Sequence, residues 1–280
     1  MSDLLLRVAR RDGGRYRNPW LAPGTSIPLL LVLLLVVAVF FPSLFTPYTP
    51  EQMDFSAILQ PPDLRHWFGT DQLGRDVFTR VVYGTSLSLS IGVGATLIAS
   101  AGGIVLGTLA GLAPRAVRQL LVRLLDIMLA FPDLLLALLA ITVLGRGPEN
   151  TLLAVGLAGI AGYARLVRAQ VLQVRLSALG EPPMVIILRH IVPNTLRPLL
   201  VLATVGIGYS ILSASALSFL GLGVTPPTAE WGALLSEGRN FLDSAPWVSL
   251  LPASVVALSV IAITLLGRRV QTLIAKGGIA

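Results

Sequence analysis

Cysteine is absent from the 280 residues, and lysine occurs once, as Lys276. Without cysteine the chain has neither a disulfide framework nor a thiolate metal site. Histidine occurs only as His66 and His190, so we also predict no metal site and no catalytic residue. Charged residues make up 12% of the chain, whereas a soluble domain carries about 25%. This shortage of charge excludes an ordinary water-soluble domain.

Long apolar runs take the place of the missing charge. Hydrophobic residues make up 54% of the chain, and the mean hydropathy is +0.80. A helix needs about 20 mostly apolar residues to cross a bilayer. Six segments meet this requirement, of which the fourth is short and is expected to extend on both sides, and we therefore predict an all-α membrane protein with six transmembrane helices. The segments are Ile27–Phe45, Ser86–Ala113, Leu120–Leu144, Leu152–Leu166, Pro198–Leu222 and Trp247–Gly267.

The basic residues indicate the orientation of these spans. Sixteen of the 21 lie in the N-terminal segment, the second and fourth loops and the C-terminal tail, and five lie on the opposite side. Cytoplasmic loops carry the excess of Lys and Arg, so both termini are predicted to be cytoplasmic (N-in, C-in). The positive charge is thus a topology signal and does not indicate nucleic-acid binding.

This topology divides the chain into a membrane domain with two flanking segments. Residues 1–26 are predicted to form a cytoplasmic N-terminal segment, and residues 268–280 a cytoplasmic tail. The transmembrane domain covers residues 27–267. It includes an extracytoplasmic loop at about 42–85 and a cytoplasmic loop at about 168–197. The first apolar run is too long for a signal peptide, and no clean small-residue cleavage site follows it, so we interpret it as an anchor.

The extracytoplasmic loop contains the stretch "HWFGTDQLGRDVFTRVVYG", in which acidic and basic residues alternate at short helical spacings. Its glycines permit turns that other residues resist. One interpretation is a salt-bridged cap on the membrane surface, and the other is a docking surface or a lid over a pathway. The candidate residues are Gly69, Asp71, Gly74, Arg75, Asp76 and Arg80.

Two features inside the spans leave alternatives open. Small residues recur every fourth position, and such a stripe can pack against a partner subunit or within the chain. They are Ala95, Ala99, Gly103, Gly107 and Gly111. The fifth span carries serines that can line a polar path or bond to the backbone. They are Ser210, Ser213, Ser215 and Ser218.

Two acidic residues fall within the third span, and intramembrane acids are functional candidates by default. Asp126 lies close to the cytoplasmic start, where it can pair with Arg123. Asp133 follows Pro132, at an expected kink. A proton relay needs a chain of such groups, and the other spans offer none.

Several motifs in order resemble one family. "ALG", followed ten residues after its glycine by "HIVPN", resembles the EAA loop with which ABC-importer permeases dock on a cytoplasmic ATPase. "FGTDQLGRDVFTRVVYG", "DIMLAFPDLLLALLAI", "GYARLVRAQVL" and "ALSFLGLGVTPPTAEWG" resemble the C-type permeases of dipeptide, oligopeptide and nickel importers. The resemblance covers about residues 28–267.

The resemblance implies a type I ABC-importer permease fold and a multi-pass protein of the bacterial plasma membrane. Such a permease pairs with a homologous B-type permease, and two ATPase subunits bind beneath the pair. An extracytoplasmic binding protein delivers the substrate, most often a di- or oligopeptide. The chain has no G-x-x-x-x-G-K phosphate loop. It is therefore expected to be non-catalytic and to hold no cofactor, with ATP and Mg²⁺ in the ATPase subunits.

The same resemblance assigns the coupling turn to Ser177–Pro183. Gly180 can end one short helix, and Pro182 and Pro183 suit the start of the next. Where relatives carry Glu-Ala-Ala, this chain has Val174, Arg175 and Leu176, and the preceding stretch is about seven residues shorter. The expected coupling residues are Leu176, Ser177, Ala178, Leu179, Gly180, Glu181, His190, Pro193 and Asn194.

Two other classes are weighed against the permease. A multi-pass membrane enzyme needs a nucleophile and base at one depth, but His66 and His190 are predicted on opposite sides of the membrane. An ATP-independent secondary transporter would work without partner ATPases. The motifs do not separate dipeptides, longer peptides, nickel and glutathione as substrates.

Overall fold

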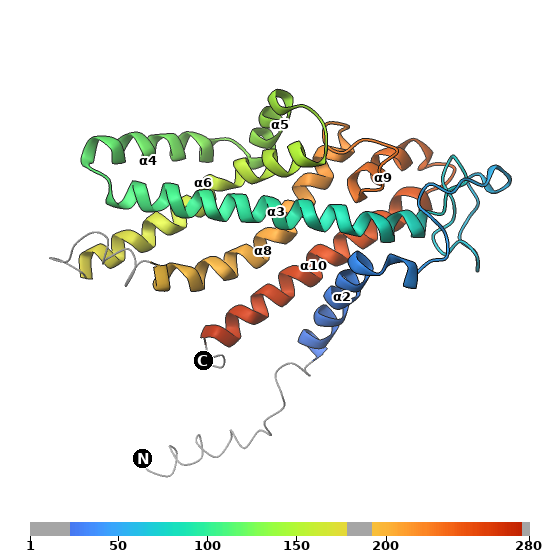
Figure 1. The fold of residues 1–280 in the computed structure, drawn as a ribbon, viewed down its shortest axis with the longest axis horizontal. Helices are drawn as coiled ribbons and strands as arrows, with labels where there is room; N and C mark the ends of the chain where they lie inside the picture. The colour runs from blue at the N-terminus through green and yellow to red at the C-terminus, as the bar shows by residue number, and fades with distance from the viewer. Residues whose placement is uncertain (1–22, 178–191, 276–280) are drawn as a thin grey trace, which may run out of the picture.

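The computed structural model describes residues 23–177 and 192–275, which form a bundle of long helices (Figure 1). Within these ranges the prediction of an all-helical protein is confirmed, and the only bridge of β type joins Thr70 and Asp76. The α-helices are α2 (Pro23–Phe40), α3 (Val77–Leu112), α4 (Arg115–Ala130), α5 (Asp133–Leu144), α6 (Pro148–Ser177), α8 (Val192–Phe219), α9 (Trp231–Gly238) and α10 (Trp247–Ala275).

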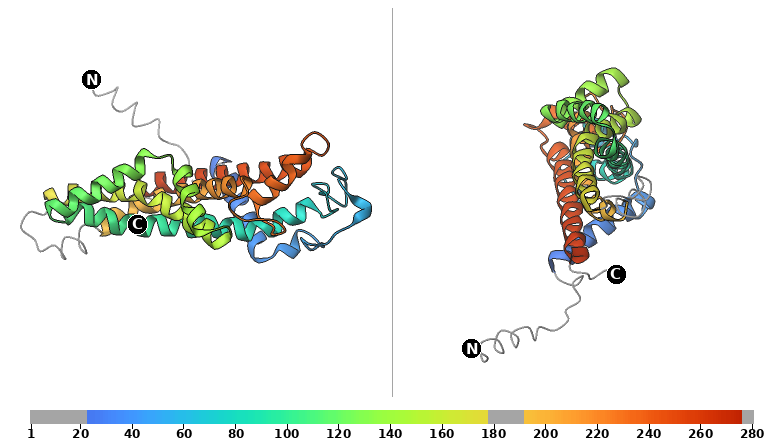
Figure 2. Two further views of the ribbon diagram at one scale, coloured as in Figure 1. Left: turned by 90° about the horizontal axis from the view of Figure 1, so that it is seen from above. Right: turned by 90° about the vertical axis from the view of Figure 1, so that its left-hand side faces the viewer.

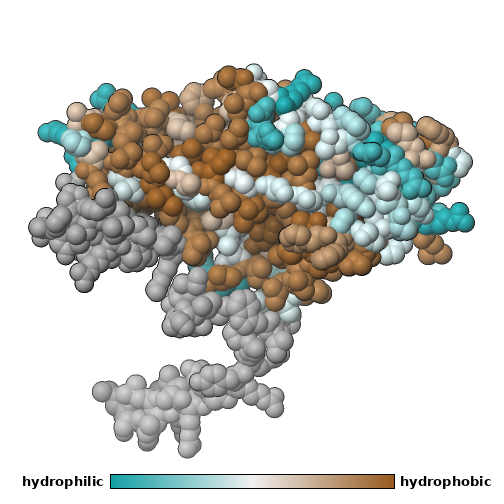
Figure 3. Space-filling model, in the orientation of Figure 1, coloured by the Kyte–Doolittle hydropathy of each residue, from teal (hydrophilic) through white to brown (hydrophobic). Residues whose placement is uncertain are grey.

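Four helices are long and apolar enough to cross a membrane, namely α3, α6, α8 and α10. They correspond to the second, fourth, fifth and sixth predicted spans. α6 begins at Pro148 and ends at Ser177, so it extends beyond the predicted Leu152–Leu166 at both ends, as expected. Figure 3 shows an apolar surface over most of the bundle, and hydrophilic residues gather at the end that holds the segments before α3 and around α9.

The first predicted span is shorter in the structure. α2 ends at Phe40, and its apolar part, Thr25–Phe40, has fewer than 18 residues. The predicted end at Phe45 is therefore wrong. Pro42 explains the difference, because a residue before proline avoids the helical conformation. Phe41 accordingly has φ −135° and ψ 58°, and Pro42–Leu44 form a separate 3₁₀ turn.

The third predicted span is not one continuous helix. It is divided into α4 and α5, whose axes differ by 100°. Phe131, with φ −93° and ψ 142°, is extended, and Pro132 cannot donate a backbone hydrogen bond to continue the helix. The expected kink at Pro132 is confirmed, whereas the single helix over Leu120–Leu144 is wrong. With this bent pair counted as one crossing, the described residues contain up to five spans.

The stripe of small residues on α3 packs within the chain, against α6. A Cβ added to Gly103 would lie 2.3 Å from Cβ of Tyr163, and one added to Gly107 would lie 2.6 Å from the carbonyl oxygen of Ala164. One at Gly111 would lie 2.4 Å from a Val171 methyl group. Small residues therefore let the two backbones approach closely, which is how helices associate where lipid removes the hydrophobic drive.

The segments expected outside the membrane gather at one end of the bundle. The chain between α2 and α3 and the segment around α9 lie there together (Figure 2), whereas α3 and α6 end at the opposite end (Figure 1). A hydrogen bond of 2.9 Å from Nε of Arg269 to Oγ1 of Thr25 holds the end of α10 beside the beginning of α2. The start of α2 and the end of α10 therefore lie side by side.

Replacement of Gly107 by alanine should destabilise the bundle, because the new methyl group meets the Ala164 carbonyl oxygen and the Val167 side chain of α6. The expected loss is about 1–3 kcal/mol, as for other overpacked sites. Gly162→Ala on α6 is the matched control, since no atom lies within 4 Å of a Cβ built there. Thermal unfolding of the two variants in detergent measures the difference. Equal stability of the two would show that the α3–α6 contact is not tightly packed.

Candidate functional site

Charged residues just before α3 and in its first turn form a buried ion-pair cluster with α9, at the end of the bundle expected to lie outside the membrane. We use the name outer cluster for Asp71, Arg75, Arg80 and Glu237. Nε of Arg75 lies 2.7 Å from Oδ2 of Asp71, and Nη1 of Arg80 lies 3.0 Å from the same oxygen. Glu237 Oε2 accepts from Nη2 of Arg75 at 2.9 Å and also from Arg80. The cluster is electrically balanced, with two cations and two carboxylates.

Turn geometry places the acidic members of this segment. The Asp71 side chain accepts hydrogen bonds from the backbone N–H groups of Leu73 and Arg75, at 2.8 and 3.0 Å. Gly74, at φ +71°, allows the return of the chain, and a Cβ there would lie 1.9 Å from the Asp54 carbonyl oxygen. Asp76 then caps α3 by accepting from the Thr79 N–H at 2.6 Å. These hydrogen bonds therefore fix the backbone between Asp71 and the first turn of α3.

The outer cluster differs in one respect from the predicted surface cap. The alternating charges do pair, but the side chains of the four residues are only 1–8% exposed. Glu237, 162 residues from Arg75 in sequence, was not among the predicted residues. His66 and Asp76 form a separate pair, 2.9 Å apart, beside the cluster. In the described structure these charges thus join the start of α3 and the segment before it to α9.

α9 is held on α3 by a second buried acid. Glu230 is 1% exposed and accepts from the backbone N–H groups of Gly232 and Ala233, both at 2.9 Å. Ser88 on α3 donates to Glu230 at 3.2 Å, and the Trp231 indole donates to the Val81 carbonyl at 3.0 Å. Burial raises the pKa of Glu230, although the hydrogen bonds that its carboxylate accepts act against that shift. Glu230 occupies the N-cap position of α9, but glutamate is not among the residue types preferred there, so no local signal identified it.

A cavity of about 340 Å³ lies between α3, α5, α6 and α8, near the middle of the three long helices. Its lining is mostly apolar and small. The lining residues are Ala99, Asp133, Ala137, Val155, Ala158, Gly159, Gly162, Tyr163, Leu202, Val205, Gly206, Tyr209, Ser210 and Ser213. A cavity of this size falls at the lower end of the range that small-molecule sites occupy.

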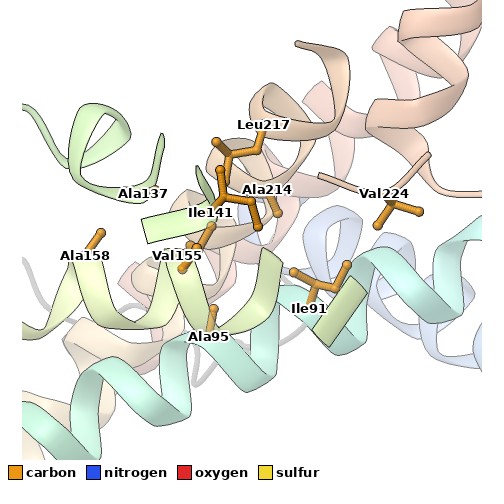
Figure 4. Packing of buried hydrophobic residues seen from close by; sticks show 10 residues of the cluster. Ile91, Ala95, Ala137, Ile141, Val155, Ala158, Ala214, Leu217 and Val224 are labelled. Carbon is orange, nitrogen blue, oxygen red and sulfur yellow. The ribbon is translucent and has the colours of Figure 1, made fainter. Parts of the chain in front are cut away.

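A packed apolar cluster borders the cavity. It shares Ala137, Val155 and Ala158 with the lining and continues to Leu217 and Val224 (Figure 4). Its members come from α3, α5, α6, α8 and the segment after α8. The short α5 therefore packs against the same helices that line the cavity. The break at Pro132 places the beginning of α5, and with it Asp133, at the cavity.

Asp133 is the one acidic residue in the cavity lining. The hydroxyl of Tyr209 donates to its Oδ2 at 3.2 Å. Asp133 is the first residue of α5, where the helix dipole favours a negative charge. Asp126 lies elsewhere: it is exposed and sits 3.6 Å from Arg165, so the expected pairing with Arg123 is wrong.

The four candidate serines divide into two pairs. Ser210 and Ser213 line the cavity, and Ser210 lies 3.1 Å from the Thr96 hydroxyl. Ser218 instead accepts a hydrogen bond from the Val224 N–H at 3.0 Å. Ser215 is buried at the contact between α8 and α9. A Cβ added to Gly232 of α9 would lie 2.3 Å from the Ser215 carbonyl oxygen. Tyr163 and Tyr209, which were not among the predicted residues, also line the cavity.

Most of the predicted coupling residues lie outside what the structure describes. The structure does not describe residues 178–191, which include Gly180, Glu181 and His190. Leu176 and Ser177 at the end of α6, and Pro193 and Asn194 at the start of α8, are described by their backbone only. Within the described residues, no group of three His, Cys, Asp or Glu side chains is arranged to hold a metal ion.

Loss of the Glu237 carboxylate should destabilise the outer segments. In Glu237→Ala, two buried guanidinium groups share the single carboxylate of Asp71. Breaking a buried ion pair in this way costs about 3–5 kcal/mol. Asp243→Ala, which removes an exposed acid from the same segment, is the control and should have little effect. Thermal unfolding and protease sensitivity near α9 measure the change, and equal behaviour of the variants would contradict a structural role for the cluster.

Comparison with known proteins places the chain in a family. Residues 103–277 match the model of the binding-protein-dependent transport system inner membrane component. The dipeptide transport system permease protein DppC of Alkalihalophilus pseudofirmus is 41% identical over 246 residues, which cover 85% of this chain and 81% of that protein. The glutathione transport system permease protein GsiD of Escherichia coli is 43% identical over 261 residues, covering 90% and 85%.

The di/tripeptide transport system permease protein DppC of Pseudomonas aeruginosa is 40% identical over 254 residues, covering 85% of this chain and 83% of that protein. These matches confirm the resemblance seen in the motifs. They also agree with the apolar helices of the fold, which indicate a multi-pass membrane protein. The chain therefore belongs to the family of binding-protein-dependent transport system inner membrane components, the non-catalytic permease subunits of ABC transporters.

Proposed function

We propose that this chain forms half of the translocation path of an ATP-driven importer for short peptides. The observation that carries the proposal is the similarity to the relatives above, which are named for transport of dipeptides, di- and tripeptides, and glutathione. Glutathione is itself a short peptide, so the three names share one substrate class. The similarity covers at least 85% of this chain in each case and includes the cavity-lining helices.

The proposed topology has six crossings with both termini in the cytoplasm of a bacterium. The crossings are α2, α3, the bent pair α4–α5, α6, α8 and α10. The 18 residues of α2 give a length of about 27 Å, close to the hydrocarbon thickness of about 30 Å. The hydrogen bond between Arg269 and Thr25 supports a common side for the two termini. The outer cluster then lies on the extracytoplasmic side.

A permease of this kind needs partners for energy and delivery. In our proposal it pairs with a homologous B-type permease, sits on two ATPase subunits and receives substrate from an extracytoplasmic binding protein. The lack of a phosphate loop supports this division of labour, because the chain has no sequence element for holding nucleotide phosphates. ATP and Mg²⁺ are therefore assigned to the ATPase subunits, and no cofactor to this chain.

We assign coupling to the cytoplasmic segment between α6 and α8, around Ser177–Pro183. Its support is positional. α6 ends and α8 begins at the end of the bundle opposite the outer cluster (Figure 1). The sequence there keeps the spacing from Gly180 to His190 that the family motif has. Because the stretch is shorter than in relatives and lacks Glu-Ala-Ala, the contact is expected to depend on Leu176, Leu179 and the turn.

Transport should require ATP hydrolysis by partner subunits. The complex that copurifies with the tagged chain, reconstituted in liposomes with its binding protein, should take up a radiolabelled dipeptide only when ATP is enclosed with the ATPase domains. The isolated chain should not hydrolyse ATP. Uptake driven by an ion gradient without ATP would instead identify a secondary transporter, and sustained hydrolysis by the isolated chain would identify an enzyme.

A single cysteine at the coupling turn should cross-link to the ATPase. The chain has no cysteine of its own, so Ser177→Cys or Glu181→Cys introduces a unique thiol. Either should form a disulfide with a cysteine placed in the ATPase docking groove, detected as a shifted band on a non-reducing gel. Asp243→Cys, at the opposite end, is the control and should not react. An assembled, active complex in which neither turn position cross-links would locate the coupling contact elsewhere.

A further inference from the structure

Among the described residues, no cation pairs with the carboxyl group in the cavity. Six ion pairs occur among the described residues, five of them in the outer segments. The sixth joins Asp126 to Arg165, whose side chains are 62% and 64% exposed. No described Lys, Arg or His nitrogen lies within 4.0 Å of the Asp133 carboxylate. Its hydrogen-bond partner within the described chain is the hydroxyl of Tyr209.

Such an acid is costly at this position. A charged side chain in the membrane interior is tolerated when it faces a cavity or a partner group. Asp133 does face a cavity, and the rest of the lining supplies hydroxyl groups but no further charge. A cation from outside the chain would therefore complete the site. Tyr209 holds one carboxylate oxygen and leaves the other for that cation.

We propose that Asp133 is the cation-recognition residue of the cavity and binds the ammonium group of the passing substrate. The proposal rests on the proposed function for the identity of that substrate, a short peptide. Such a peptide presents an ammonium at its amino terminus and, with lysine, a second on a side chain. The Tyr209 hydroxyl is assigned the role of positioning the carboxylate. The rest of the lining is small and mostly apolar, so it adds little selectivity among side chains.

The charge preference of the cavity can be measured without any transport assay. Gly162→Cys places a unique thiol in the lining, at a position with no atom within 4 Å of the new Cβ. In the assembled complex, the thiol is treated with a trimethylammonium and with a sulfonate methanethiosulfonate reagent. We expect the cationic reagent to react faster, after each rate is divided by its rate with a free thiol. Asp133→Asn should reduce this ratio roughly tenfold, since nearby charges interact strongly at an intermediate dielectric.

The control variant is Asp126→Asn, which removes the same formal charge from an exposed site outside the cavity. It should leave the ratio of the two rates unchanged. An equal effect of the two variants, or no cation preference in the parent complex, would overturn the proposal. So would loss of the partner permease from Asp133→Asn with its retention in Asp133→Glu, because the carboxylate would then pair with a cation of the partner.

Uptake assays distinguish the two sources of the ammonium group. For peptides that the parent complex carries, the ratio of variant to parent uptake cancels the selectivity of the binding protein. Asp133→Asn should reduce uptake of a lysine-containing dipeptide more than that of a glutamate-containing one if side-chain ammonium groups bind. An equal reduction for free peptides, absent for amino-terminally blocked ones, assigns the site to the terminal ammonium. Equal loss for all peptides, blocked ones included, would assign Asp133 a structural role and overturn the proposal.

These measurements separate the two proposals from each other. If the complex carries no peptide but the thiol at residue 162 still shows a preference for cations that depends on Asp133, the proposed substrate class is wrong and the cation site stands. If peptides are carried but the preference is absent, the cation site is wrong and the proposed function stands.

Discussion

The close approach of α3 and α6 is the contact on which the rest of the structure depends. Gly103, Gly107 and Gly111 remove side-chain volume along one face of α3, and backbone and side-chain atoms of α6 occupy the space. In a bilayer no hydrophobic effect drives helices together, so this packing has to supply the association itself. The cavity is bounded by the same two helices, and the outer cluster begins at the start of α3. A shift between α3 and α6 would therefore alter both.

The outer cluster extends this rigid pair at the end of the bundle where α3 begins. Arg80 lies in the first turn of α3, and its partner Glu237 lies in α9. A buried network of this kind contributes little net stability compared with apolar packing, yet it fixes one arrangement, because any other leaves charges unpaired. The segment that precedes α3 and the segment that follows α8 are thus held in one fixed position relative to each other. In the proposed topology, substrate delivered by the binding protein would meet this end, whose parts are joined by the cluster.

The sequence predicted the fold where one local property decides it. Hydropathy alone identified α3, α6, α8 and α10, because crossing a bilayer demands a long apolar helix. Pro132 itself indicated the break in the third span, but the 100° angle depends on how α5 packs against α6 and α8, which no local pattern encodes. Likewise, the charges from Asp71 to Arg80 were recognisable, whereas their partner Glu237 is far away in sequence. The serines show the same limit, since only the packing of α8 separates those at the cavity from those against α9.

A permease has to let its substrate leave, and the composition of the cavity suits this requirement. Conduction needs interactions strong enough to admit the substrate and weak enough to release it. Small apolar residues such as Gly159, Gly162 and Ala158 offer little to hold a peptide. One carboxylate at Asp133, already sharing an oxygen with Tyr209, would orient an ammonium group without enclosing it. Tight selection is then left to the binding protein in our proposal, and the path itself recognises only an ammonium group.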